Sequence, residues 1–132
     1  MILPRHAFFR GRLVPYEQAR VGVLTHALNY GTAVFAGIRA YWNAEEEELF
    51  VFRPLDHFRR LLESAKLLGM RLPFTEEGLA AALTELLRVE LYREDCYIRP
   101  LAFYADEAVG VRLHDLEGRV RSITFEARKP RA

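Results

Sequence analysis

The side chains from Val34 to Trp42 alternate strictly between two sets, and this pattern constrains the fold more than any other in the chain. One set holds large or charged groups and a glycine: Phe35, Gly37, Arg39 and Tyr41. The other set is apolar and mostly small: Val34, Ala36, Ile38, Ala40 and Trp42. Because successive residues of a strand point to opposite faces, the stretch predicts one continuous strand with two different faces.

Other segments predict further strands, most of them paired in hairpins. An Arg-Gly-Arg turn around Gly11 predicts a hairpin within residues 7–14. An acidic turn at 43–48 predicts a second hairpin, with its returning strand at 49–52. Cys96 to Phe103 is typical of a buried strand, and the alternation from Val120 to Ala127 predicts the last strand.

Two consecutive helices are predicted between these strands. Pro54 suits a first helical turn, apolar residues recur at helical spacing as far as Leu68, and Gly69 suits a left-handed end. Thr75 is a typical N-cap for the second helix, whose apolar face is Leu79, Leu83, Leu86 and Leu87. Antiparallel hairpins with two consecutive helices indicate an α+β fold rather than a doubly wound parallel sheet.

Length and charge exclude several classes of protein. A chain of 132 residues with 51% hydrophobic content predicts one domain spanning residues 1–132. The net charge of +1 gives no attraction for nucleic acid or for an anionic membrane. No window approaches the roughly 20 apolar residues of a membrane span, and the N-terminus has no secretory apolar segment, so we expect a cytoplasmic location. The lone Cys96 excludes an internal disulfide, and its apolar setting favours an inert buried thiol over a reactive one.

The sequence lacks the motifs of several enzyme classes. It has neither a glycine-rich phosphate loop of familiar spacing nor a Gly-x-Ser-x-Gly segment. The histidines are scattered without metal-ligand spacing, so we expect no metal site; they are His6, His26, His57 and His114. The run from Glu45 to Glu48 is interpreted as a solvated hairpin turn.

Three arginines stand where they could hold an anion. Arg39 and Arg99 each fall on a strand face that also carries aromatic rings. This pattern is typical of a pocket that binds acids against an apolar wall, but two arginines on exposed faces would give it equally well. Arg60 lies near the edge of the first helix's apolar face, where a guanidinium could bind phosphate or simply face solvent.

Five segments in order resemble the branched-chain aminotransferases, a family of fold-type IV enzymes that use pyridoxal phosphate. The segments are Phe9-Arg10-Gly11 with Leu13-Val14, His26 to Thr32, Val34 to Tyr41, His57 to Leu61 with Ser64-Ala65-Lys66, and Tyr97 to Leu101. They cover nearly the whole chain at family spacing, so the chain is identified as a small N-terminal domain of this family. Ala36 departs from the pattern, because the family usually has Glu there.

The resemblance implies a cofactor site and a substrate site. Arg60 would bind the phosphate of pyridoxal phosphate. Phe35 would form a wall of the pocket for the branched side chain, and Tyr97 would help to recognise the substrate carboxylate. The implied ligands are branched-chain amino or keto acids and glutamate.

The resemblance also implies contributions to an acidic substrate and to a partner subunit. Arg99 would hold the distal carboxylate when glutamate occupies the pocket, and Arg39 would support that arrangement. Tyr30 and Val111 would be offered across a dimer interface to the partner's site. The implied assembly is therefore a homo-oligomer.

The family's catalytic lysine belongs to a larger domain, which we expect to be absent from these 132 residues. Lys66 and Lys129 are the only lysines, and neither matches the catalytic position. We therefore expect no catalytic residue in this chain and no turnover by the chain alone. Two other hypotheses stay open: a non-catalytic binding or assembly module, and one half of an enzyme whose large domain is a separate polypeptide.

A small domain without its large domain should expose apolar surface. We expect self-association through such a patch, because large exposed apolar surfaces usually mark interfaces. The candidates are Phe9, Tyr30, Phe35, Tyr41 and Phe103.

Overall fold

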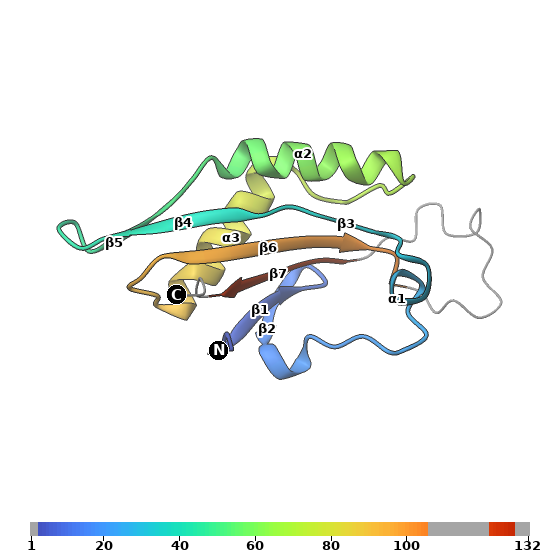
Figure 1. The fold of residues 1–132 in the computed structure, drawn as a ribbon, viewed down its shortest axis with the longest axis horizontal. Helices are drawn as coiled ribbons and strands as arrows, with labels where there is room; N and C mark the ends of the chain where they lie inside the picture. The colour runs from blue at the N-terminus through green and yellow to red at the C-terminus, as the bar shows by residue number, and fades with distance from the viewer. Residues whose placement is uncertain (1–2, 106–121, 129–132) are drawn as a thin grey trace.

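One antiparallel sheet of seven strands organises the computed structural model, which describes residues 3–105 and 122–128 (Figure 1). The order along the sheet is β2-β1-β7-β6-β4-β5, and β3 also pairs with β6. The strands are β1 (His6–Phe9), β2 (Arg12–Pro15), β3 (Ala33–Phe35), β4 (Ile38–Asn43), β5 (Glu48–Val51), β6 (Cys96–Phe103) and β7 (Ser122–Arg128). Together with the helices this sheet confirms the α+β class.

Both predicted hairpins are present. Between β1 and β2, Arg10 and Gly11 adopt φ values of 53° and 84°, the left-handed conformations that a tight hairpin turn requires. Between β4 and β5, the side-chain oxygen of Asn43 accepts the backbone N–H groups of Glu45 and Glu46. This local hydrogen bonding explains why a turn of mostly glutamate residues is well formed.

The single strand predicted from Val34 to Trp42 is wrong, because two strands, β3 and β4, occupy it with a break at Ala36 and Gly37. Ala36 donates its backbone N–H to the Pro100 carbonyl on β6 at 3.1 Å. Proline has no N–H to return, so the ladder loses a hydrogen bond at this point. The alternation itself is confirmed, since buried and exposed residues still alternate at the start of β4.

The two predicted helices are α2 (Pro54–Leu67) and α3 (Glu76–Glu90). Gly69 follows α2 with a φ of 74°, and the Thr75 hydroxyl caps α3 by accepting the Gly78 N–H at 3.1 Å. Two short elements were not predicted: η1 (Tyr16–Gln18), a 3-10 helix, and α1 (His26–Tyr30). Helices this short carry too few residues for periodicity to reveal.

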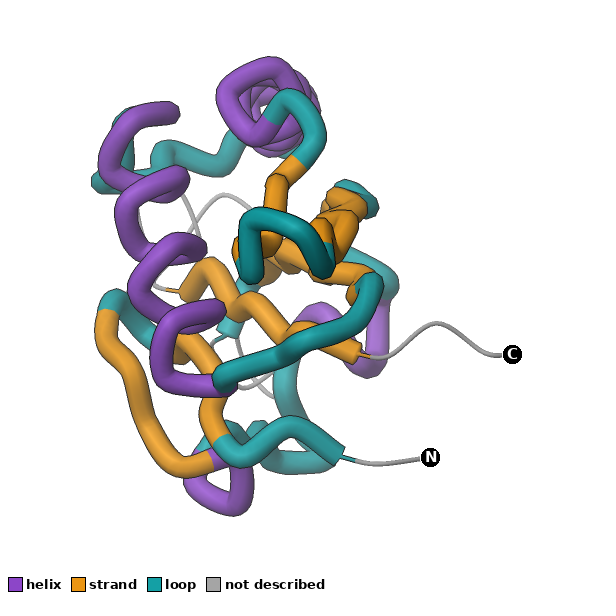
Figure 2. The backbone as a smooth tube through the Cα atoms, turned by 90° about the vertical axis from the view of Figure 1, so that its left-hand side faces the viewer, coloured by secondary structure: helices purple, strands orange, loops and turns teal. Residues whose placement is uncertain are grey.

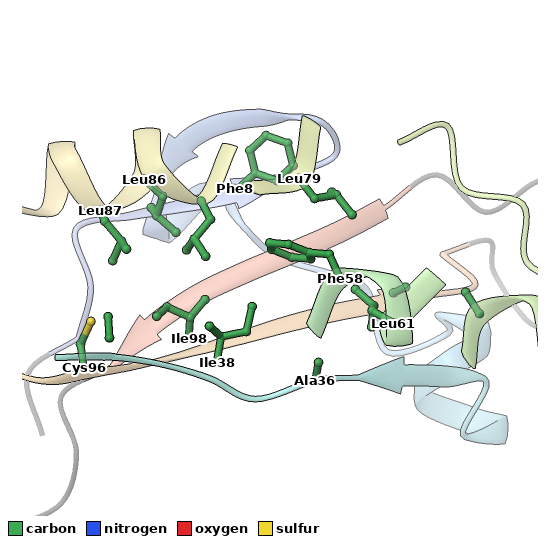
Figure 3. Close-up of a cluster of buried hydrophobic side chains, with 14 of the residues drawn as sticks. Phe8, Ala36, Ile38, Phe58, Leu61, Leu79, Leu86, Leu87, Cys96 and Ile98 are labelled. Atoms are coloured by element: carbon green, nitrogen blue, oxygen red, sulfur yellow. The ribbon is translucent and has the colours of Figure 1, made fainter. Parts of the chain in front are cut away.

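The main core lies between the two long helices and one face of the sheet (Figure 3). Figure 2 shows α3 running along this side of the strands. The predicted apolar face of α3 is buried, and the core also takes in Phe58 and Leu61 of α2 with Ile38 and Ile98 of the sheet. Ala36 lies in the same core at 3% exposure, so its difference from the family pattern falls on the helix side of the sheet.

The opposite face of the sheet is only partly covered. At one end, Phe9 and Phe103 form a second small core with Val14, packed under Ala19 and Ala27. The prediction that Phe9 and Phe103 are exposed is therefore wrong, because the segments that carry η1 and α1 fold back over them. The other three candidates are exposed as predicted: Tyr30, Phe35 and Tyr41.

Candidate functional site

Four of the predicted site residues meet on the open face of the sheet. Phe35 and Arg39 are exposed on β3 and β4, and Tyr97 and Arg99 are half-buried on the adjacent β6. The strand register places Arg39 directly opposite Tyr97 and Phe35 opposite Leu101. Because alternate residues of a strand share a face, the residues predicted to surround one acid come from neighbouring strands.

Arg99 is held between two aromatic rings. Its guanidinium carbon lies 4.4 Å from the centre of the Phe35 ring and 5.4 Å from that of Tyr97. Its Nε donates a hydrogen bond of 3.1 Å to the Tyr97 hydroxyl. A cation over an aromatic face contributes about 0.5–1 kcal/mol at exposed sites. The two rings therefore stabilise the guanidinium, and the hydrogen bond to Tyr97 orients it. The sequence left two interpretations of Arg99, a place on the wall of an acid-binding pocket or a place on an exposed face. This geometry agrees with the first.

Arg39 is less constrained. Its side chain is exposed, and no hydrogen bond or ion pair joins it to any residue in the described part of the chain. Tyr41, two residues along β4, lies opposite Phe50 of β5 and extends the same ring-rich face. Arg39 therefore adds positive charge beside Tyr97 without a fixed partner.

An apolar cavity lies farther along the same face of the sheet, and none of Phe35, Arg39, Tyr97 and Arg99 lines it. It has a volume of about 320 Å³, and Leu101, the register partner of Phe35, contributes to its wall. The other lining residues are almost all apolar and come from β1, β3, β6 and the segment around α1: Phe9, Ala19, Val21, Thr25, Ala27, Leu28, Ala33 and Phe103. The Arg99 guanidinium therefore lies on the same face of the sheet as a cavity large enough for a small ligand.

Tyr30 lies apart from this group, at the end of α1. Its side chain is 67% exposed, and its ring contacts His26 with centroids 4.7 Å apart. The buried His26 bonds the Thr32 hydroxyl through Nδ1 at 2.8 Å, and Gly31 ends α1 with a φ of 68°. No hydrogen bond or ring contact between described residues joins Tyr30 to Arg99. Val111, the other residue predicted at a dimer interface, lies outside the described residues.

Arg60 and its neighbour Arg59 differ sharply on α2. Arg59 contacts both carboxylate oxygens of Glu76 at 3.2 Å, and this hydrogen bonding raises the pKa of Arg59. Arg60 is exposed, and among the residues that the structure describes it has no hydrogen-bond or ion-pair partner. Arg60 is therefore the member of this pair whose N–H groups remain available for an anion. No hydrogen bond, ion pair or ring contact between described residues joins it to Phe35, Tyr97 or Arg99, although α2 packs against β3.

The remaining predictions about chemistry concern metal binding and reactivity. Within residues 3–105 and 122–128 no group of three or more potential metal ligands occurs, and no helix is long and apolar enough to cross a membrane. Cys96 is 2% exposed, and burial, reinforced by the nearby carboxylates, raises its pKa to about 12. The prediction that this thiol is buried is confirmed. Lys66 is exposed in the last turn of α2, and Lys129 lies outside the described residues.

Sequence reasoning missed the interaction of His26 with Thr32, which braces the turn that carries Tyr30. His26 lies in α1 and Thr32 follows the left-handed turn at Gly31, so neither helical nor strand periodicity predicts their contact. The described residues of the site can bind an acid and an apolar group side by side.

The relatives found by comparison with known proteins share one description, branched-chain-amino-acid aminotransferase. The chain is 45% identical over 109 residues to a probable branched-chain-amino-acid aminotransferase of Aquifex aeolicus, covering 83% of this chain and 35% of that protein. It is 36% identical over 110 residues to the branched-chain-amino-acid aminotransferase of Pseudomonas aeruginosa, again covering 83% and 35%. The chain thus spans about a third of the length of these relatives. No protein-family model matches it.

Solved structures agree with these sequence relatives. The branched-chain aminotransferase of the archaeon Thermoproteus uzoniensis with norvaline superposes with a TM-score of 0.84 at 44% identity, covering 94% of this chain and 40% of that one. The branched-chain amino acid aminotransferase of Thermobaculum terrenum in its PLP-form gives a TM-score of 0.84 at 34% identity, covering 100% and 42%.

Proposed function

The chain is homologous to the branched-chain-amino-acid aminotransferases over about 35% of their length, and we propose that it forms the small N-terminal domain of such an enzyme. The parent reaction transfers an amino group between leucine, isoleucine or valine and 2-oxoglutarate. One pocket must then accept a branched apolar side chain and an acidic one in turn. The observation that carries the proposal is that Arg99, stacked on Phe35, lies on the same open face of the sheet as an apolar cavity whose wall includes Leu101, two residues along β6.

The acidic substrate is assigned to Arg99 and Arg39. Arg99 uses Nε for the Tyr97 hydroxyl, so its two terminal NH₂ groups remain for a distal carboxylate. Arg39 stands opposite Tyr97 in the register and adds a second positive charge. The Tyr97 hydroxyl accepts from Arg99 and keeps its own proton to donate to the substrate carboxylate.

The apolar substrate is assigned to the ring surface and the cavity on the same face of the sheet. Phe35 is 61% exposed, so its ring can form one wall for a branched side chain. The exposed Tyr30 would be offered to a partner's site in a homo-oligomer, and homology alone assigns Val111 the same role. Apolar side chains near Tyr30 are also exposed, including Val23 at 79% and Leu28 at 64%, which supports association of this surface with another subunit.

Pyridoxal phosphate is the implied cofactor, and Arg60 is the described residue that would bind its phosphate. The exposed, unpaired guanidinium of Arg60 fits that role, whereas Arg59 is already occupied by Glu76. When bound, the cofactor supplies the electron sink that amino transfer needs. Neither Lys66 nor Lys129 is assigned to hold it, so we propose that these 132 residues alone do not catalyse transfer. A cytoplasmic location is part of the same proposal.

The test is a titration of the purified chain with pyridoxal 5'-phosphate, read by difference absorbance and competed with inorganic phosphate. We expect binding that is lost in Arg60→Ala and retained in Arg59→Ala, the matched control. A parallel assay for leucine-dependent formation of glutamate from 2-oxoglutarate should give no product. Equal binding by the two variants would contradict the role of Arg60, and turnover would contradict the inactivity of the chain.

A further inference from the structure

Gly37 lies at the break between β3 and β4, directly under the residues that hold Arg99. The register on both sides of the break, Phe35 with Leu101 and Ile38 with Ile98, places Gly37 opposite Arg99 on the open face. Successive residues on this face of the chain are thus Phe35, Gly37 and Arg39. The glycine leaves a gap in a row of large side chains.

The Tyr97 ring fills this gap. A Cβ atom added at Gly37 would lie 2.5 Å from the Tyr97 hydroxyl oxygen and 2.9 Å from Cε2 of the ring. Real Cβ atoms do not approach other heavy atoms so closely, because van der Waals repulsion rises steeply below about 3.5 Å. Gly37 does not have a positive φ, so the constraint is space and not backbone conformation. Gly31 is the opposite case, with a φ of 68° and nothing within 4 Å of an added Cβ.

The position of Tyr97 in turn determines that of Arg99. The Tyr97 hydroxyl, the atom closest to the added Cβ, is the acceptor for Arg99 Nε. That hydrogen bond restricts the guanidinium to the place where it stacks on Phe35 at 4.4 Å. If the hydroxyl moved, Arg99 would keep its charge but lose the contact that defines its direction.

We infer that Gly37 is a positioning residue for acid recognition: by having no side chain, it lets Tyr97 lie flat on the sheet and aim Arg99 across Phe35. The inference rests on the proposed function for the assignment of Arg99 to a substrate carboxylate. Its geometric part depends only on contacts within the chain. The atoms that an alanine at 37 would meet belong to the far end of a side chain, so the variant should fold and Tyr97 should rotate away.

The experiment compares Gly37→Ala with Gly22→Ala by NMR. Gly22 is the matched control, because an added Cβ there meets nothing within 4 Å and its φ is not positive. In the parent chain and in Gly22→Ala we expect a nuclear Overhauser contact between the Arg99 Nε–H and the Phe35 ring. In Gly37→Ala we expect this contact to be lost while the spectrum remains that of a folded chain. A retained contact would overturn the inference.

If Gly37→Ala folds poorly, its effect on stability can be measured again in a chain that lacks the Tyr97 ring. In a Tyr97→Ala chain the obstructing ring is gone, so adding Gly37→Ala should lower the urea midpoint far less than it does in the parent. An equal loss in both backgrounds would show that Gly37 does not act through Tyr97, and would overturn the inference.

Binding of two small molecules tests the link between Gly37 and acid recognition. Glutarate is the acidic probe, and 4-methylvalerate is the apolar probe. Gly37→Ala should weaken glutarate binding by about tenfold or more, because both Arg99 and Tyr97 are displaced, and weaken 4-methylvalerate binding less, because that probe has no second carboxylate for Arg99. Equal weakening of both would overturn the role in acid recognition. If the parent chain binds neither probe, the assignment of Arg99 to a substrate carboxylate is contradicted, while the contact between Arg99 and Phe35 still decides the geometric inference.

Discussion

The carboxylate of Glu90 lies 3.0 Å from Nδ1 of His6, although 84 positions separate the two residues in the sequence. The Glu90 side chain is 1% exposed, and it also accepts the backbone N–H groups of Arg5 and His6 at 3.0 and 2.7 Å. These bonds tie the start of β1 to the end of α3. The buried charge also contributes, after burial itself, to a raised pKa of Tyr92.

Replacing Glu90 by alanine should therefore be strongly destabilising. The change leaves two part-buried backbone N–H groups without their acceptor, and an unsatisfied group costs about 1–3 kcal/mol when it is fully buried. We expect a loss of about 3 kcal/mol in the free energy of unfolding, measured by urea denaturation. Glu85→Ala is the matched control on the same helix, because Glu85 is exposed, and it should change stability by less than about 0.5 kcal/mol. Similar losses in both variants would show that the buried bonds contribute little.

Two leucines of α2 provide a matched test of the main core. Leu61 is 1% exposed, whereas Leu67 is 87% exposed in the last turn of the same helix. Leu61→Ala should cost about 2–5 kcal/mol, because it removes buried methyl groups and leaves a cavity. Leu67→Ala should cost less than about 0.5 kcal/mol. The measurement is thermal and urea unfolding of the two variants. A comparable cost at Leu67 would mean that this side chain is covered in solution.

The cap of α3 should contribute measurably to stability. Thr75 accepts the Gly78 N–H, and replacing such a cap by alanine costs about 1 kcal/mol. Thr84→Ala is a suitable comparison, since the Thr84 hydroxyl only donates to the Ala80 carbonyl within the same helix. That change should be neutral or slightly stabilising, because alanine has the higher helix propensity. Circular dichroism during urea unfolding distinguishes the two, and an unchanged Thr75→Ala midpoint would contradict the cap.

The Cys96 thiol should be protected from alkylation in the folded chain. Burial raises its pKa to about 12, so almost no thiolate forms at about pH 8. Iodoacetamide should modify the native chain at least about a hundredfold more slowly than the urea-unfolded chain, as followed by mass spectrometry. Rapid modification under native conditions would contradict the burial.

The same shift gives a sign for the pH dependence of stability. Between the ordinary thiol pKa of about 8.5 and the folded value of about 12, the unfolded chain releases a proton that the folded chain keeps. The folded state then binds more protons, so the free energy of unfolding should fall as pH rises through this range. Cys96→Ser keeps a small side chain without a thiol that titrates there, and its stability should depend less on pH over the same interval.

Local signals predicted most of the regular elements. Pro54 and Thr75 mark the helix starts, and the strand predicted from Cys96 to Phe103 has the bounds of β6. These features depend on residues close together in the chain. The break in the strand at Ala36 was missed because its cause, the missing N–H of Pro100, lies on another strand.

The site was predicted less completely than the fold. Residue types and alternation indicated Arg39 and Arg99 among rings, but the same pattern suited two arginines facing solvent. Only the pairing of β3 with β6 brings Phe35 against Arg99. Glu90 gave no signal as a buried group, since a glutamate at the end of a helix usually faces water.

The sequence by itself determined the two long helices, both hairpins and the strand from Cys96 to Phe103, the apolar face of the second long helix, and the family that the chain resembles. The elements and their faces follow from periodicity, caps and turn residues, whose energetics act over a few neighbouring positions. The tertiary structure alone decided that Tyr97 lies on Gly37, that Arg99 stacks on Phe35, and that Glu90 binds the start of β1. These contacts join distant segments through strand register and burial, and a one-residue change of register would move every such side chain to the other face of the sheet.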